Sequence, residues 1–207
     1  LLVAIGGIIV VWLAGFKIKY FAYLSLIFIF SIPVVITLLK PYQKSRILTF
    51  LNPERDPLGA GYQIIQSKIA VGSGGIFGKG FLNGSQSHLN FIPEMQTDFI
   101  FTLLAEEFGI FGTLVLLILF MILIFYTMII GLLCKSRFAC FLVLGVSINI
   151  FYYVFINTAM VSGLIPVVGV PLPLVSYGGT SMMCVMFGMG LVSNAYINRN
   201  LSIPRYK

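Results

Sequence analysis

Long apolar runs constrain this chain more than any other feature of its sequence. The run Ile110–Leu133 contains no charged residue, and similar runs occupy 21–39, 138–165 and 180–197. A helix needs roughly 20 apolar residues to cross the hydrocarbon of a bilayer. Because lipid offers no hydrogen-bond partner to the backbone, segments of this kind cross a membrane as helices. The sequence therefore predicts an all-α polytopic membrane protein.

The composition agrees with this fold class and excludes a soluble domain. Only 9% of the residues are charged and 59% are hydrophobic, whereas soluble domains carry about 25% charged residues. The net charge of +7 is typical of membrane topology and of contact with anionic lipid, and we expect no nucleic-acid partner. Cys134, Cys140 and Cys184 have no metal or redox spacing and are interpreted as buried free thiols.

We expect one membrane domain over 1–207, with about five transmembrane helices and a large structured extracytoplasmic loop. The expected order is two spans in 1–39, an extracytoplasmic loop over 40–97, two spans in 98–165, a second such loop over 166–179, a last span over 180–198 and a tail over 199–207. The first apolar run is short and has no initiator Met, so an N-terminal part is expected to be missing.

The short basic segments predict the orientation of these spans. Lys17 and Lys19, Lys135 and Arg137, and the C-terminal tail all fall on the same side of the membrane in a five-span chain. Short cytoplasmic segments carry an excess of Lys and Arg. The C-terminus is therefore predicted to be cytoplasmic, and both long loops are predicted to face outward.

The segment Phe91–Gly109 joins the polar outer loop to a long apolar run and places Asp98 at the membrane boundary. A carboxylate at the centre of a bilayer costs about 3 kcal/mol even on lenient scales, so acids in or beside a span are candidates for function. On a helix, small residues including Ala105 and Gly109 share the face of Asp98, which favours close packing against protein. Two interpretations remain open for Asp98: a helix-capping acid or a catalytic group.

Other polar residues of the spans are expected to be structural. Glu106 and Glu107 point about 100° apart on a helix and so have different partners. One is expected to pair with a basic group or a helix end, and the other to line a polar cavity. Asn157, in the fourth span, is expected to form interhelical hydrogen bonds.

The outer loop contains a helical pattern followed by a glycine-rich run. Tyr62, Ile65 and Ile69 fall on one helical face, which predicts a short interfacial helix. The segment Val71–Gly80 carries five glycines in ten residues. That run suits close approach to a phosphate, but it lacks the spacing of a P-loop, and a flexible turn is the alternative.

A second unusual stretch, Asn157–Ser181, contains several prolines and glycines between two spans. Irregular backbone at membrane depth is tolerated only where it is buried in protein or lines a cavity. The segment Ser176–Ser181 opens the last helix, whose free N–H groups would suit a pyrophosphate. An ordinary re-entrant cap is the alternative.

These stretches resemble the SEDS family (shape, elongation, division and sporulation), whose branches include RodA, FtsW and SpoVE. The resemblance is closest to RodA and runs from about Lys40 to Asn198. It rests on long gapped motifs: Leu51–Gly75, Gly84–Ser87, Pro93–Phe99 and Asn157–Ser181.

The resemblance implies a polytopic peptidoglycan glycosyltransferase with about ten spans, of which this chain would hold the C-terminal part. Such proteins polymerise lipid II on the outer face of the bacterial plasma membrane. The RodA branch acts in lateral-wall elongation and cell shape, with a class B penicillin-binding transpeptidase and other elongation-complex membrane proteins. Because only about half of the spans are present, this chain alone is not expected to be active.

The resemblance also implies which residue carries the chemistry. Asp98 matches the family's essential aspartate in the motif Pro-Glu-x-x-Thr-Asp-Phe, here Pro93–Phe99. Gln96 stands where the family commonly has histidine, so no imidazole role carries over to this chain.

The favoured hypothesis is a hexosyltransferase in which Asp98 acts as general base on the acceptor sugar hydroxyl of lipid II. The donor would be the growing glycan on undecaprenyl pyrophosphate. No cofactor is assigned, although a divalent cation held by Asp98 is an alternative and its other ligands are unknown. The residues expected to bind substrate are Arg55, Lys68, Lys79, Glu94, Thr97, Ser176, Gly178, Gly179, Thr180 and Ser181.

Two other functions remain open at this stage. A lipid II flippase would also use intramembrane acids and broken helices, and Glu106 and Glu107 would then matter more than Asp98. A non-catalytic membrane scaffold for the transpeptidase would tolerate the loss of the Asp98 carboxylate.

Overall fold

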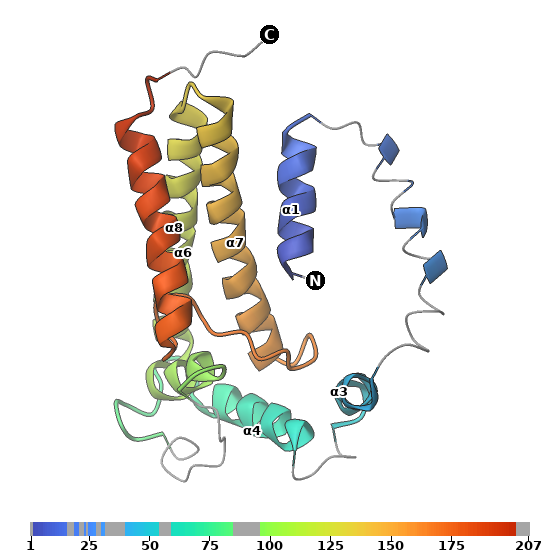
Figure 1. The fold of residues 1–207 in the computed structure, drawn as a ribbon. Helices are drawn as coiled ribbons and strands as arrows, with labels where there is room; N and C mark the ends of the chain where they lie inside the picture. The colour runs from blue at the N-terminus through green and yellow to red at the C-terminus, as the bar shows by residue number, and fades with distance from the viewer. Residues whose placement is uncertain are drawn as a thin grey trace.

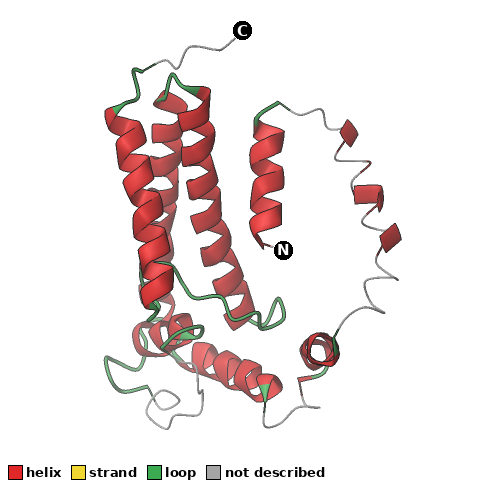
Figure 2. Ribbon diagram, in the orientation of Figure 1, coloured by secondary structure: helices red, strands yellow, loops and turns green. Residues whose placement is uncertain are grey.

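The computed structural model describes residues 2–15, 19–20, 23, 25–27, 30–31, 40–53, 59–84 and 96–201. These residues form helices and loops, with no strand among them, as the sequence predicts (Figure 2). The helices are α1 (Leu2–Leu13), α3 (Pro41–Leu51), α4 (Ala60–Ser73), α6 (Ile100–Leu133), α7 (Arg137–Val161) and α8 (Gly179–Ile197). Arg55, Glu94, the motif residues 85–87 and most of the expected second span lie outside the described residues.

Three helices, α6, α7 and α8, are long and apolar enough to cross a membrane. They stand side by side, with α1 alongside α7 (Figure 1). Most of their surface is apolar and exposed, as expected for helices in contact with lipid. The chain is therefore an integral membrane protein.

A small polar contact joins α6 to α7 within the apolar core. The Thr127 hydroxyl bonds to the Ser147 hydroxyl at 3.0 Å, and both side chains are fully buried. Hydrogen bonds of this kind hold helices together in lipid, where burial of apolar surface gives no driving force.

The two ends of the bundle differ in character. The short connection after α6 and the end of α8 lie at one end, where Lys135 N donates to Arg199 O at 2.9 Å. The loop over 162–178, the start of α6, and α4 lie at the opposite end, where α4 runs across the bundle (Figure 1). Asp98 and the basic residues Lys135, Arg137 and Arg199 therefore lie at opposite ends.

The predicted helix of the outer loop is present as α4, but the face toward the bundle is not the one marked by Tyr62, Ile65 and Ile69. The packed face carries Ile64, Ser67 and Ala70, each at most 3% exposed, whereas Ile69 is 47% exposed. The small side chains allow close approach, and the Ser67 hydroxyl donates to Val161 O at 2.7 Å. The face with Ile69 is the one left for the membrane interface.

The sequence predicts one continuous helix from about Gln96 to Leu133, but α6 begins at Ile100 and is broken at Gly109. This glycine has φ 66° and ψ −162°, outside the helical region. Residues 74–80, which we call the glycine loop, enter the break. A Cβ at Gly74 or Gly78 would come within 2.0 Å of a carbonyl oxygen of α6, so these two glycines allow the loop to contact the α6 backbone.

Candidate functional site

Asp98 lies in a turn over 96–99, which we call the entry turn, immediately before α6. Phe99 occupies the N-cap position of α6, and no side chain caps this helix end. Asp98 therefore lies one residue before the N-cap position of α6.

The loop over 162–178, which we call the anchoring loop, and the end of α7 fix the backbone of the entry turn. Three consecutive carbonyls of the turn accept hydrogen bonds: Gln96 O from Tyr177 N at 2.9 Å, Thr97 O from the Ser176 hydroxyl, and Asp98 O from Asn157 Nδ2 at 2.8 Å. The position of the Asp98 backbone is therefore set by residues 59 to 79 positions away in the chain.

Asn157 is the central residue of this anchoring. Its side chain is fully buried, and its amide nitrogen also donates to Val170 O at 2.7 Å. One amide thus ties the entry turn and the anchoring loop to α7. The sequence predicts hydrogen bonds from Asn157 to other helices. In the structure, its side chain instead bonds to the backbone of two non-helical segments, the entry turn and the anchoring loop.

The Asp98 carboxylate lies against Gly169 of the anchoring loop. A Cβ at Gly169 would come within 3.1 Å of Asp98 Oδ2, and its φ of +76° is also a conformation that favours glycine. Gly169 therefore leaves room for the carboxylate. The motif that contains Gly169 can be found in the sequence, but the contact between Gly169 and Asp98 can be found only from the fold.

We expect Asn157→Ala to destabilise the protein much more than Asn149→Ala on the same helix. An unsatisfied buried acceptor costs about 1–3 kcal/mol, so loss of both Asn157 bonds should lower the free energy of unfolding by about 2–5 kcal/mol. Asn149 is exposed and makes no hydrogen bond within the described part of the chain. Denaturant titration of both variants of the full-length protein measures the difference, and equal effects would contradict the anchoring role.

A hollow of about 510 Å³ lies between the entry turn and the start of α8. Its lining includes Gln96 from the entry turn and Ser176, Gly178 and Gly179 from the approach to α8. Ser176 is itself buried, and its oxygen accepts from Leu172 N at 2.7 Å while its hydrogen goes to Thr97 O. The hydroxyl of Ser176 therefore joins the anchoring loop to the entry turn. The backbone N–H groups that open α8 lie beside this hollow, together with the Gln96 side chain.

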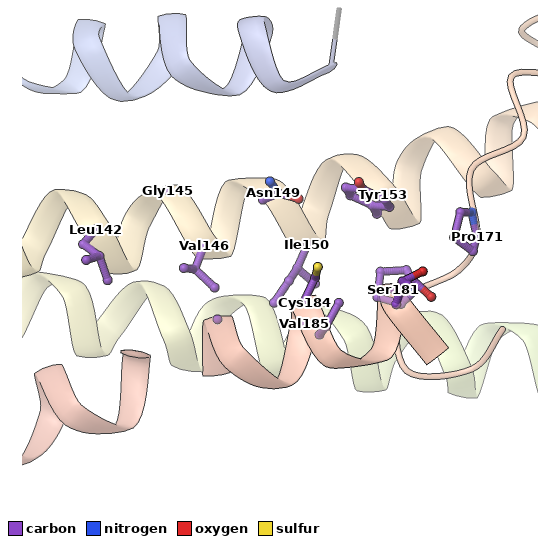
Figure 3. Close-up of a pocket in the computed structure, with 13 residues that line it drawn as sticks. Leu142, Gly145, Val146, Asn149, Ile150, Tyr153, Pro171, Ser181, Cys184 and Val185 are labelled. Atoms are coloured by element: carbon purple, nitrogen blue, oxygen red, sulfur yellow. The ribbon is translucent and has the colours of Figure 1, made fainter. Parts of the chain in front are cut away.

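A second cavity, of about 580 Å³, lies between α7 and α8 on the other side of the α8 start (Figure 3). Thr180 and Ser181 line its end near the anchoring loop, and Asn149 and Tyr153 line its α7 wall. Much of the remaining wall is apolar. Two hollows thus flank the first turn of α8, one beside the entry turn and one inside the span.

The basic residues expected to bind substrate have different surroundings. Lys68 is exposed on α4 and lies over Gly163 of the anchoring loop. Lys79 is engaged with Glu106 at 2.7 Å, which fulfils the prediction that one of the two adjacent glutamates has a basic partner. Glu107 is buried and has no ion pair among the described residues.

Sequence reasoning did not select Arg46 of α3. Its guanidinium lies 3.3 Å from Val167 O and 3.5 Å from Val168 O, directly before Gly169. No local pattern distinguishes Arg46 from the other basic residues of the outer loop, so this contact could not be found without the fold.

The fold and site define a helical membrane protein with a carboxylate residue on an anchored turn at one end of its bundle. The model of the FtsW/RodA/SpoVE family, described as a cell cycle protein, matches residues 1–201. The chain belongs to this family, which is the SEDS family.

Curated relatives carry glycosyltransferase and sporulation names. Peptidoglycan glycosyltransferase MrdB of Escherichia coli K12 is 46% identical over 97% of this chain and 55% of its own length. Stage V sporulation protein E of Bacillus subtilis is 42% identical over 90% of this chain and 50% of its own length. The chain thus spans about half the length of these relatives.

A solved structure has the same fold. It belongs to work on the structural coordination of polymerization and crosslinking by a peptidoglycan synthase complex. Its chain is 34% identical, with a TM-score of 0.70, over 94% of this chain and 54% of its own length.

Proposed function

We propose that the full-length protein is a peptidoglycan glycosyltransferase that polymerises lipid II during lateral cell-wall elongation. One relative described above, at 46% identity, is named a peptidoglycan glycosyltransferase. The observation that carries the proposal is the entry turn, because hydrogen bonds to three consecutive carbonyls hold the backbone that carries Asp98. A positioned general base needs this kind of preorganisation.

In the proposed reaction, Asp98 accepts the proton of the sugar 4-hydroxyl of lipid II. The hydroxyl oxygen then forms a bond to the anomeric carbon of the growing glycan, and the bond from that carbon to undecaprenyl pyrophosphate breaks. The N–H groups that open α8 lie beside the entry turn and would stabilise the departing pyrophosphate. Gly178 and Gly179 line the hollow beside the entry turn and would join this substrate site together with Thr97. Thr180 and Ser181 line the cavity between α7 and α8 instead.

The proposal includes an orientation and a partner. Lys135, Arg137 and Arg199 lie at the end of the bundle opposite to Asp98, so the positive-inside rule makes that end cytoplasmic and directs Asp98 outward. The membrane would be the bacterial plasma membrane. The partner would be a class B penicillin-binding transpeptidase, in line with the synthase complex of the structural relative.

A divalent cation at Asp98 is an alternative to direct proton transfer. No three His, Cys, Asp or Glu side chains come together in the described ranges. A cation at this site would therefore draw ligands from backbone carbonyls, water or the substrate pyrophosphate, in addition to Asp98.

A lipid II flippase is the second candidate, favoured by the buried Glu106 and Glu107 beside a broken helix. The two functions separate in one experiment, with the full-length protein and its transpeptidase in liposomes that contain labelled lipid II. Long glycan would support the proposed function. Movement of the label across the membrane without glycan would support the flippase. If neither glycan formation nor movement of the label is observed, the scaffold is favoured.

A further inference from the structure

We propose that Lys79 and Glu106 are positioning residues for Asp98, because they lock the glycine loop into the break of α6. The effect on catalysis rests on the proposed function, whereas the lock itself is a property of the fold. The inference assigns a role to a buried ion pair that the proposed reaction does not use.

The glycine loop replaces two hydrogen bonds of the α6 ladder. In an unbroken helix, Ile110 N would bond Glu106 O and Phe111 N would bond Glu107 O. Here these two amides donate to Gly75 O at 2.9 Å and to Ile76 O at 3.0 Å. The two freed carbonyls of α6 accept from Lys79 N and Gly80 N, both at 3.0 Å.

The ion pair joins the same two segments a second time. Lys79 Nζ lies 2.7 Å from Glu106 Oε1, and the Glu106 side chain is only 1% exposed. Lys79 therefore holds Glu106 through both its backbone N–H and its side chain. Removal of the Lys79 ammonium would leave a buried carboxylate without this partner, which favours opening of the contact.

Glycines make this approach sterically feasible. A Cβ at Gly78 would come within 2.0 Å of Glu107 O, and a Cβ at Gly74 would come within 2.0 Å of Ala105 O. The two segments are therefore in direct backbone contact, and a small shift of the glycine loop must displace α6.

The break separates a short helical segment, 100–108, from the membrane-spanning part of α6. Asp98 lies two residues before this segment, and Glu106 lies near its other end, about 9 Å from Ile100 along the helix axis at 1.5 Å per residue. The anchoring loop holds the first end, and the glycine loop holds the second. Because Phe101, Thr102 and Ala105 are buried between these ends, the segment moves as one unit and carries Asp98 with it.

The expected kinetic result is a loss of kcat with little change in KM for lipid II. Misplacement of a reacting group by about 1 Å can cost about 100-fold in rate. We expect Lys79→Met and Glu106→Gln to lower kcat by roughly 10- to 100-fold. Lys79→Arg keeps the cation and should restore most of the rate. Glu107→Gln is the matched control, because Glu107 is equally buried but has no ion pair in the described part of the chain.

A cross-link reports the lock independently of activity. The rings of Phe81 and Phe108 lie 6.2 Å apart on the two sides of the contact, and both side chains are exposed. In full-length protein with its other cysteines replaced, the pair Phe81→Cys and Phe108→Cys should form a disulfide readily. Adding Lys79→Met should reduce its yield several-fold, whereas adding Lys79→Arg should not.

The inference is wrong if Lys79→Met and Glu106→Gln leave both kcat and the disulfide yield at the values of the unmodified protein. It is equally wrong if the yield falls while kcat stays unchanged, or if only KM changes. Failure of the proposed function has a different signature, because the unmodified protein would then make no glycan while the cross-link still responds to Lys79→Met.

Discussion

Asp98→Asn should lower the rate of glycan formation from lipid II by about 10²- to 10⁴-fold, the usual contribution of a general base. Asparagine has the shape of aspartate but cannot accept the proton. The contacts that hold the entry turn go to the backbone carbonyls of residues 96–98, so this substitution leaves them intact. The measurement is the initial rate of polymerisation by the full-length protein with its transpeptidase.

The control for Asp98→Asn is to show that the variant protein is folded and binds its partner. Its abundance, its capture of the transpeptidase and its thermal midpoint should match those of the unmodified protein, since no anchoring bond is lost. If this folded variant polymerises lipid II at the unmodified rate, Asp98 is not the base and the proposed mechanism is wrong.

Gly78→Ala should disrupt the contact between the glycine loop and α6. Gly78 has φ +78°, and the added Cβ would meet Glu107 O at 2.0 Å. The left-handed conformation alone costs a residue other than glycine about 1–3 kcal/mol, and the backbone clash adds to this cost. We therefore expect a clear fall in the free energy of unfolding, measured by denaturant titration, together with a loss of polymerisation.

Gly72→Ala provides the matched control six residues earlier in the same run. Gly72 lies inside α4 at a helical position with open space around it. Alanine should be neutral there or stabilise the protein by about 0.5–1 kcal/mol, because glycine is unfavourable within a helix. Similar destabilisation by both substitutions would show that the glycine loop does not depend on close backbone contact.

The membrane-spanning helices could be predicted from the sequence because their signal is local. Uninterrupted apolar runs determine α6, α7 and α8 through length and hydropathy alone. The helix α4 follows from its periodicity, but the side that packs on the bundle does not. The packed side carries Ser67 and Ala70, which have small side chains and give no strong apolar signal.

The arrangement around Asp98 could be predicted only in part. The motif resemblance selects Asp98, but the bonds from Asn157 and Ser176 join positions 59 and 79 residues apart. No local pattern encodes such contacts. The break at Gly109 was also missed, because a single glycine in an apolar run is compatible with a helix. The hydrogen-bonding groups that replace the broken ladder come from a distant loop.

The most direct test of the central claim places lipid II in one leaflet of liposomes that hold the full-length protein and its transpeptidase in one known orientation. The account predicts long glycan only when lipid II is in the leaflet that Asp98 faces, and none with Asp98→Asn. Glycan formed from the opposite leaflet alone, or label that crosses the membrane without forming glycan, would contradict it.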